Sequence, residues 1–200
     1  MTTRILQIDS SLFGGAGVSA QLAEFALTKI KAQYDDVVVV KRDLAADPIP
    51  HFDASTIADI TDGKAALADT LIAELVEADV LIVGAPMYNF GVPSVLKAWM
   101  DHVARAGSTF KYTETGPVGL LSDTKVIVLA TRGGIHLGQP SDVETPFIKN
   151  FFSFLGLTDI EFVYAEGLNL SGGQREQAIT KAEAAISDLV SALSEQGEVA

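Results

Sequence analysis

Two short runs of apolar residues constrain the fold of this chain more than any other feature. Residues 80–85 read VLIVGA and residues 126–130 read VIVLA, and neither run contains a charged residue. Strands that are apolar at nearly every position need cover on both faces, which parallel strands between two layers of helices receive. The two runs therefore predict a parallel sheet with helices on both sides.

Five segments in all are expected as strands, and helical patterns separate them. The expected strands are Arg4–Asp9, Val37–Asp43, Val80–Ala85, Lys125–Ala130 and Ile160–Ala165. Apolar residues recur at helical spacing within residues 22–30, 67–76, 95–103 and 179–193. Such alternation is typical of right-handed crossovers in a doubly wound sheet. The expected fold is α/β: a three-layer, doubly wound, five-stranded parallel sheet in the flavodoxin-like order 2-1-3-4-5.

Two connections, Leu44–Asp62 and Arg105–Asp123, are longer than simple loops. Long excursions in compact domains often carry function, and a plain surface loop is the equal alternative. Within the second excursion, Phe110–Thr113 is expected to form one arm of a hairpin.

Length and charge limit the classes of function. The 200 residues fit one domain over residues 1–200, with residues 195–200 frayed. A net charge of -12 argues against nucleic acid and anionic membranes, which bind clusters of Lys and Arg. There is no cysteine and no constellation of acidic residues with metal-ligand spacing, so we expect no metal. No apolar run approaches the roughly 18 residues of a spanning helix, and we expect a cytoplasmic protein without a membrane partner.

Ligands of such sheets bind beyond the carboxyl ends of the strands, which draws attention to the loops after strands 1, 3 and 4. The first loop, DSSLFGGAGVSAQL, offers the hydroxyls of Ser11 and Ser19 and glycines such as Gly17 that let amides face an anion. It contains no Lys or Arg, so we expect a phosphate monoester held mainly by neutral donors. Residues 15–20 also fit the G-x-G-x-x-[GA] dinucleotide pattern, and a merely structural loop is a further alternative.

The second loop, APMYNFGVP at residues 85–93, combines a thioether, two aromatic rings and an amide between prolines. This set suits a large flat heteroaromatic ring, with Met87 and Tyr88 packed on the ring and Asn89 on its polar edge. A buried loop filled with aromatic side chains is the alternative.

The third loop, TRGGIH at residues 131–136, carries two consecutive glycines. The N–H groups of Gly133 and Gly134 can donate to a carbonyl at the edge of a planar ligand, which in a flavin stabilises negative charge at N1 and O2. Arg132 either adds charge there or pairs with a surface acid. His136 is expected either to line the substrate side of the ring or to donate a proton.

Ordered motifs along the chain resemble the FMN-dependent NADH azoreductase and quinone reductase family. They are DSS after the first strand, RDLAADPIP at 42–50, APMYNF at 85–90, ARAGSTFKYTETGP at 104–117, TRGGIH at 131–136 and FVYAEG at 162–167. The resemblance spans nearly the whole chain, and MYNF followed by [ST]RGG is its most specific part. Where relatives commonly have a serine in the phosphate loop, this chain has Gly17.

The resemblance implies a homodimer with one FMN per subunit and a ping-pong cycle. NADH, with NADPH as an alternative donor, reduces FMN and leaves; a quinone or an aromatic azo compound then takes two electrons, and azo bonds are cleaved to amines. The implied FMN contacts are Ser11, Gly17, Val18, Ser19, Pro86, Met87, Tyr88, Asn89, Phe90, Thr131, Arg132, Gly133 and Gly134. Tyr112 and His136 are implied near the acceptor pocket. Phe151 and Phe152 either cap the ring across the dimer interface or pack in the core.

Two other functions stay open from the sequence. A flavodoxin-type electron carrier shares the fold and the cofactor, and an NAD-binding dehydrogenase would use the glycine-rich first loop for a dinucleotide.

Overall fold

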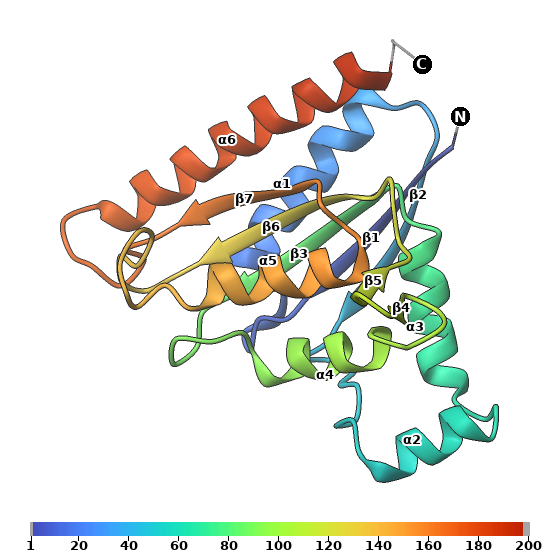
Figure 1. The fold of residues 1–200 in the computed structure, drawn as a ribbon. Coiled ribbons are helices and arrows are strands. Elements are labelled where there is room, and N and C mark those ends of the chain that lie inside the picture. Colours follow the sequence, from blue (N-terminus) through green and yellow to red (C-terminus); the bar gives the residue numbers. More distant parts are fainter. Residues whose placement is uncertain (1, 198–200) are drawn as a thin grey trace.

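The computed structural model describes residues 2–197 and contains a five-stranded sheet in which all neighbouring strands are parallel (Figure 1). In spatial order the strands are β2 (Val37–Asp43), β1 (Thr3–Asp9), β3 (Val80–Pro86), β6 (Lys125–Thr131) and β7 (Ile160–Ala165). For the strands of this sheet the order is 2-1-3-4-5, as expected. Each expected strand is confirmed to within one residue at either end.

Helices lie on both faces of this sheet (Figure 1). One face is covered by α1 (Val18–Gln33) and α6 (Gln174–Gly197), and the other by α3 (Ala66–Val76), α4 (Ser94–Val103) and α5 (Glu144–Leu155). Successive residues of a strand point to opposite faces, which is why the apolar run of β3 supplies two cores. Ile82 packs with α1 and α6, while Leu81 and Val83 pack with the other three helices. Frayed residues were expected from 195 onward: α6 continues to residue 197, and 198–200 lie outside the described residues.

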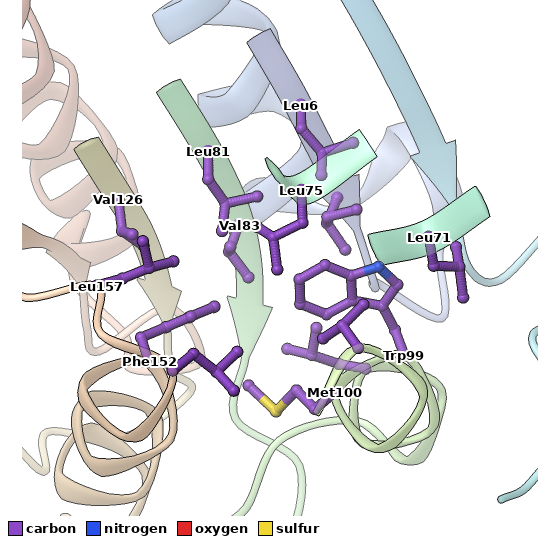
Figure 2. Close-up of a cluster of buried hydrophobic side chains, with 14 of the residues drawn as sticks. Leu6, Leu71, Leu75, Leu81, Val83, Trp99, Met100, Val126, Phe152 and Leu157 are labelled. Atoms are coloured by element: carbon purple, nitrogen blue, oxygen red, sulfur yellow. The ribbon is translucent and has the colours of Figure 1, made fainter. Parts of the chain in front are cut away.

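Figure 2 shows the core on the side of α3, α4 and α5. Trp99 of α4 and Phe152 of α5 are both fully buried in it, with ring centroids 6.5 Å apart. The core-packing alternative therefore holds for Phe152, which has no surface to offer to a ligand. Phe151 is half-buried and packs against the same core.

Both long excursions contain regular structure. The first holds α2 (Ala54–Thr61), whose start is fixed by a capping box between Asp53 and Thr56. The second holds an antiparallel hairpin of β4 (Phe110–Thr113) and β5 (Gly116–Gly119), so the expected hairpin arm is confirmed. No helix within residues 2–197 combines the length and the apolar character needed to cross a membrane.

Candidate functional site

A polar cleft of about 220 Å³ lies at the carboxyl edge of the sheet, where β1, β3 and β6 end. It brings together most of the residues expected from the first, second and third loops, which are far apart in the sequence. The expected residues that line it are Ser11, Gly17, Val18, Ser19, Pro86, Met87, Tyr88, Thr131, Arg132 and Gly133. Asn89, Phe90 and Gly134 belong to the same loops but do not line the cleft itself.

The first loop ends in the N-terminus of α1, which faces the cleft. The loop makes one turn of 3-10 helix, η1 (Gly14–Ala16), and Gly17 is the N-cap residue without a side-chain cap. Within the described chain, the N–H groups of Val18, Ser19 and Ala20 have no hydrogen-bond acceptor. Free amides together with the positive end of the helix dipole form a site for an anion.

The hydroxyls of Ser10 and Ser11 make different hydrogen bonds in this loop. The Ser10 hydroxyl donates to the carbonyl of Gly84 at 2.6 Å and so ties the end of β1 to β3. Ser11 is buried at the bottom of the cleft, and its Oγ accepts a hydrogen bond from the N–H of Phe13 at 3.2 Å. Of the two hydroxyls, Ser11 is the one that lines the cleft.

The second loop is a tight turn under backbone strain. Tyr88 and Gly91 exchange both backbone hydrogen bonds, at 2.9 and 3.1 Å, and the two residues between them have positive φ: 50° at Asn89 and 68° at Phe90. Two consecutive positive φ values are the mark of a type I′ turn. Asn tolerates this region, whereas a bulky residue such as Phe rarely occupies it. Such strain is typical of functional loops, and here it holds the Phe90 ring 56% exposed.

The three loops are bonded to one another as well as to the sheet. The N–H of Leu12 donates to the Tyr88 hydroxyl at 3.2 Å, which joins the first loop to the second. The N–H of Met87 donates to the carbonyl of Thr131 at 2.9 Å, which joins the second to the third. The cleft is therefore a preformed site rather than a set of independent loops.

The third loop pairs with the segment that follows β7. The carbonyls of Gly133 and Gly134 accept from the N–H groups of Asn169 and Gly167, at 3.0 and 2.8 Å. The N–H groups of both glycines have no acceptor within residues 2–197. Gly133 lines the cleft and Gly134 follows it, so the third loop offers free amides beside the cleft that can donate to the edge of a planar ligand.

The segment after β7 was missed by the sequence analysis. Leu168, Asn169 and Arg175 line the cleft together with the expected residues. Arg175 lies at the start of α6 and gives the cleft a cation that the first loop lacks, so the donors are not all neutral. The predicted strand order could have indicated this segment, because the fifth strand neighbours the fourth and ends at the same edge of the sheet.

Arg132 does not direct its charge into the cleft. Its side chain is fully buried among Asp142, Glu144 and Glu166, with N···O distances of 2.8, 3.4 and 3.1 Å. Only its main chain remains for a ligand of the cleft. Both alternatives considered for Arg132 are thereby corrected: the ion pairing is present, but it is buried because the loop turns the side chain back under α5.

One carboxyl of this cluster differs from the others. Glu144 is 1% exposed, and burial raises the pKa of its carboxyl to about 7 although Arg132 acts in the opposite direction. Asp142, in contrast, has a lowered pKa, because Arg132 and Thr145 donate hydrogen bonds to its carboxylate in spite of partial burial.

A second cavity, about 530 Å³ and mainly apolar, adjoins the turn of the second loop. Phe90, Gly91 and Val92 form one side of it and Val143, Glu144 and Phe147 the other. His136 lies near this region, since its ring meets the ring of Phe90 edge-on at 5.8 Å between centroids. The larger cavity suits an apolar molecule. The smaller cleft, with its free amides and Arg175, suits an anionic group such as a phosphate.

Tyr112 is not part of either cavity. It lies on β4 with 74% of its surface exposed, in a hairpin set away from the carboxyl ends of the strands (Figure 1). Within one chain, Tyr112 and Phe151 are therefore not brought to the cleft with the other expected residues.

Comparisons with known proteins identify relatives of this chain. A family model described as flavodoxin-like fold matches residues 3–190. A protein of Saccharophagus degradans named FMN-dependent NADH:quinone oxidoreductase is 59% identical over 194 residues, which cover 93% of this chain and 92% of that protein. A protein of the same name from Cellvibrio japonicus is 48% identical over 198 residues, covering 94% of this chain and 98% of that protein.

The fold is also similar to solved structures. The crystal structure of an azoreductase from Bacillus anthracis superposes with a TM-score of 0.86 at 30% sequence identity, and the match covers 94% of this chain and 99% of that one.

Proposed function

This chain belongs to the flavodoxin-like fold family of its FMN-dependent relatives, and we propose that it is an FMN-dependent NADH:quinone oxidoreductase that also reduces aromatic azo compounds. One observation carries the proposal. Free amides at the start of α1, on Val18 and Ser19, and in the third loop, on Gly133, belong to residues that line one cleft. They match the two ends of FMN that need donors, namely the phosphate and the carbonyl edge of the ring.

The residues of the cleft fit FMN in chemistry as well as in position. The amides of Val18 and Ser19, the hydroxyl of Ser11 and the guanidinium of Arg175 would hold the phosphate. Met87 and Tyr88 would pack on the ring, and the free amides of Gly133 and Gly134 would donate to its polar edge. Asn89 and Phe90 lie in the turn of the second loop, and Phe90 also lines the apolar cavity, so both would stand beside the ring on the side of the acceptor.

Bound FMN supplies hydride transfer, so the protein needs no acid-base triad. The protein's part is to fix the ring, to exclude water and to stabilise negative charge at the ring edge. The strained turn at Asn89 and Phe90 holds one wall of the acceptor site, and His136 supports that wall through its contact with Phe90. The proposal includes the ping-pong order that the resemblance implies, in which the nicotinamide leaves before the acceptor binds.

A homodimer is part of the proposal. Apolar side chains are exposed around the cleft, where a monomer would leave them in water: Leu12, Phe13, Phe90, Ile135, Leu137 and Val143. Tyr112 is exposed on the hairpin and does not reach the cleft of its own chain, so it can serve an acceptor pocket only from a second subunit. We further propose that residues 1–200 act as one domain and that the protein works in the cytoplasm, without nucleic acid or membrane partners.

Turnover with purified protein tests the function. Protein loaded with FMN is mixed with NADH or NADPH and either a simple quinone or an azo dye, and nicotinamide oxidation is followed by absorbance. We expect consumption well above the rate of the same concentration of free FMN. Consumption no faster than free flavin would favour the electron carrier, and a protein that binds NAD(H) without taking up FMN would be a dehydrogenase.

A further inference from the structure

A buried cluster of one cation and three acids lies under the third loop. The guanidinium of Arg132 contacts carboxylates of Asp142, Glu144 and Glu166, and its own side chain is fully buried. With every acid ionised, the cluster would hold two uncompensated negative charges. Burying such charge is costly, so one of the acids is expected to take up a proton.

Of the three acids in the cluster, Glu144 is the least stabilised in its ionised form. Its contact with Arg132 is the longest of the three, at 3.4 Å, and its second oxygen, Oε1, has no hydrogen-bond partner among the described residues. Asp142 accepts from Arg132 at 2.8 Å and from the N–H of Thr145 at 3.2 Å. Burial places the pKa of Glu144 at about 7, in the range where cells operate.

Glu166 links the cluster to the third loop. Its Oε1 accepts from Arg132 at 3.1 Å and from the N–H groups of His136 and Leu137 at 2.8 and 2.9 Å. Arg132 is adjacent to Gly133, whose free amide faces the cleft. A change of charge at Glu144 thus acts on Arg132, and through it on the loop that carries the free amides.

Groups on other elements also face Glu144. Lys97 and Asp101 of α4 and His51 line the same apolar cavity, and Lys97 pairs with Asp101 at 2.5 Å. The Tyr164 ring on β7 stacks under Arg132, at 5.1 Å from the guanidinium carbon to the centroid. Since Lys97 is paired with an acid of its own, Arg132 is the cation that acts on Glu144 most directly.

We propose that Glu144 is a proton-binding positioning residue. Its carboxyl gains or loses one proton, and its charge thereby sets how strongly the third loop, which carries Arg132, favours reduced over oxidised FMN. The inference rests on the proposed function. Solvent provides the proton, which stays on the Glu144 carboxyl. When Glu144 is ionised, its extra negative charge opposes the negative charge that reduction adds at the ring edge. The preference for reduced FMN therefore falls as pH rises.

Binding constants of oxidised and reduced FMN test this without turnover. FMN-free protein is titrated with each form under anaerobic conditions at about pH 6 and about pH 8.5. The quantity compared is the association constant of reduced FMN divided by that of oxidised FMN. From the lower to the higher pH, we expect this ratio to fall about tenfold more in the wild type than in Glu144→Gln. This difference corresponds to about 30 mV for a two-electron couple. Titration of the flavin itself is common to both proteins and cancels in the comparison.

Two further variants separate titration from structure. Glu144→Asp keeps a carboxyl and should retain the pH dependence. Glu74→Gln removes an acid from another arginine pair, with Arg42 at 2.5 and 2.6 Å, and should behave as the wild type. The same pH dependence in Glu144→Gln as in the wild type would overturn the inference, as would its loss in Glu74→Gln.

Infrared spectra of the wild type cover the case in which Glu144→Gln does not fold. A protonated carboxyl band present at about pH 6 should disappear by about pH 8.5, and no such change would overturn the inference. Failure of the proposed FMN site looks different, because the wild type would then bind FMN at neither pH, and the turnover assay separates an oxidoreductase from an FMN-binding electron carrier.

Discussion

Gly17 and Ser11 lie so close at the bottom of the cleft that a Cβ at residue 17 would overlap both Oγ and Cβ of Ser11. The backbone of Gly17 is extended, with φ of -70°, so the glycine is required by space and not by its dihedral angles. A serine at this position would need a different placement of Ser11. The two positions therefore form one unit of the proposed phosphate site.

Gly17→Ala should weaken FMN binding about tenfold, because the methyl group displaces Ser11 and shifts the first turn of α1. Gly15→Ala is the matched control, since a Cβ there meets no atom within 4 Å. FMN dissociation constants measured by flavin fluorescence check the prediction. Equal weakening by both variants would show that the loop, rather than the Gly17–Ser11 contact, is what matters.

The proposed site gives Asn89 two separable roles: its backbone forms the turn at positive φ, and its side-chain amide contacts the flavin. Asn89→Ala should lower the free energy of unfolding by about 1 kcal/mol because φ is positive there, whereas Asn89→Gly should not. Both variants lose the amide, and both should slow flavin reduction by NADH about tenfold. Stopped-flow absorbance and urea denaturation measure the two effects. An unchanged reduction rate in Asn89→Gly would remove the amide from the proposed site.

Arg175 should bind the phosphate by charge. Arg175→Gln is expected to weaken FMN binding about tenfold at low salt and less at high salt, because the side chain is exposed and screened. Lys181→Gln removes an exposed charge from the same helix, away from the cleft, and should have little effect. Calorimetric titration at two salt concentrations tests this. A loss that does not depend on salt would contradict a charge-based role.

Arg132 should stabilise the fold even when no FMN is bound. Arg132→Met leaves Asp142, Glu144 and Glu166 without their cation, so the free energy of unfolding of the FMN-free protein should fall by about 3–5 kcal/mol. Arg42→Met breaks a less buried pair and should cost about 1 kcal/mol. Urea denaturation compares the two variants. Equal losses would mean that burial of the Arg132 cluster adds nothing.

The buried carboxyl of Glu144 should make the free energy of unfolding depend on pH. Its folded-state pKa is raised to about 7 from an ordinary 4.5, so the folded protein binds the proton more tightly than the unfolded chain. The sign follows: this contribution is complete below about pH 4.5 and is lost as pH rises to about 7, by roughly 3 kcal/mol. Glu144→Gln lacks this loss, so the stability of the variant relative to the wild type should rise over that range. A constant difference between the two proteins would contradict the buried proton.

The positions of the strands could be predicted from the sequence because an apolar run is a local property. The run of β3 must be covered on both faces, because it is apolar at every position from Val80 to Pro86. Phe110–Thr113 was likewise predictable as a hairpin arm. The first, second and third loops were found because a parallel sheet places the carboxyl ends of its strands at one edge.

Contacts between distant segments could not be predicted in this way. Asn169 and Arg175 join the cleft because β7 lies beside β6, and no local pattern marks them as ligands. Sequence could not place Phe152 in the core or Tyr112 outside the cleft, since adjacent aromatic residues of a helix or hairpin look alike until their neighbours are known.

The sequence by itself thus determined the sheet, its order and the loops that offer amides, because periodicity and glycine placement act over a few residues. Only the tertiary structure decided which charged side chains are buried, which are paired and which reach the cleft. It turned Arg132 away from the cleft into a buried cluster, brought Arg175 to the cleft, and left Glu144 with an oxygen that has no partner within the described chain. The physical reason is that burial and pairing, which set the energy of a charge, depend on segments far apart in the chain.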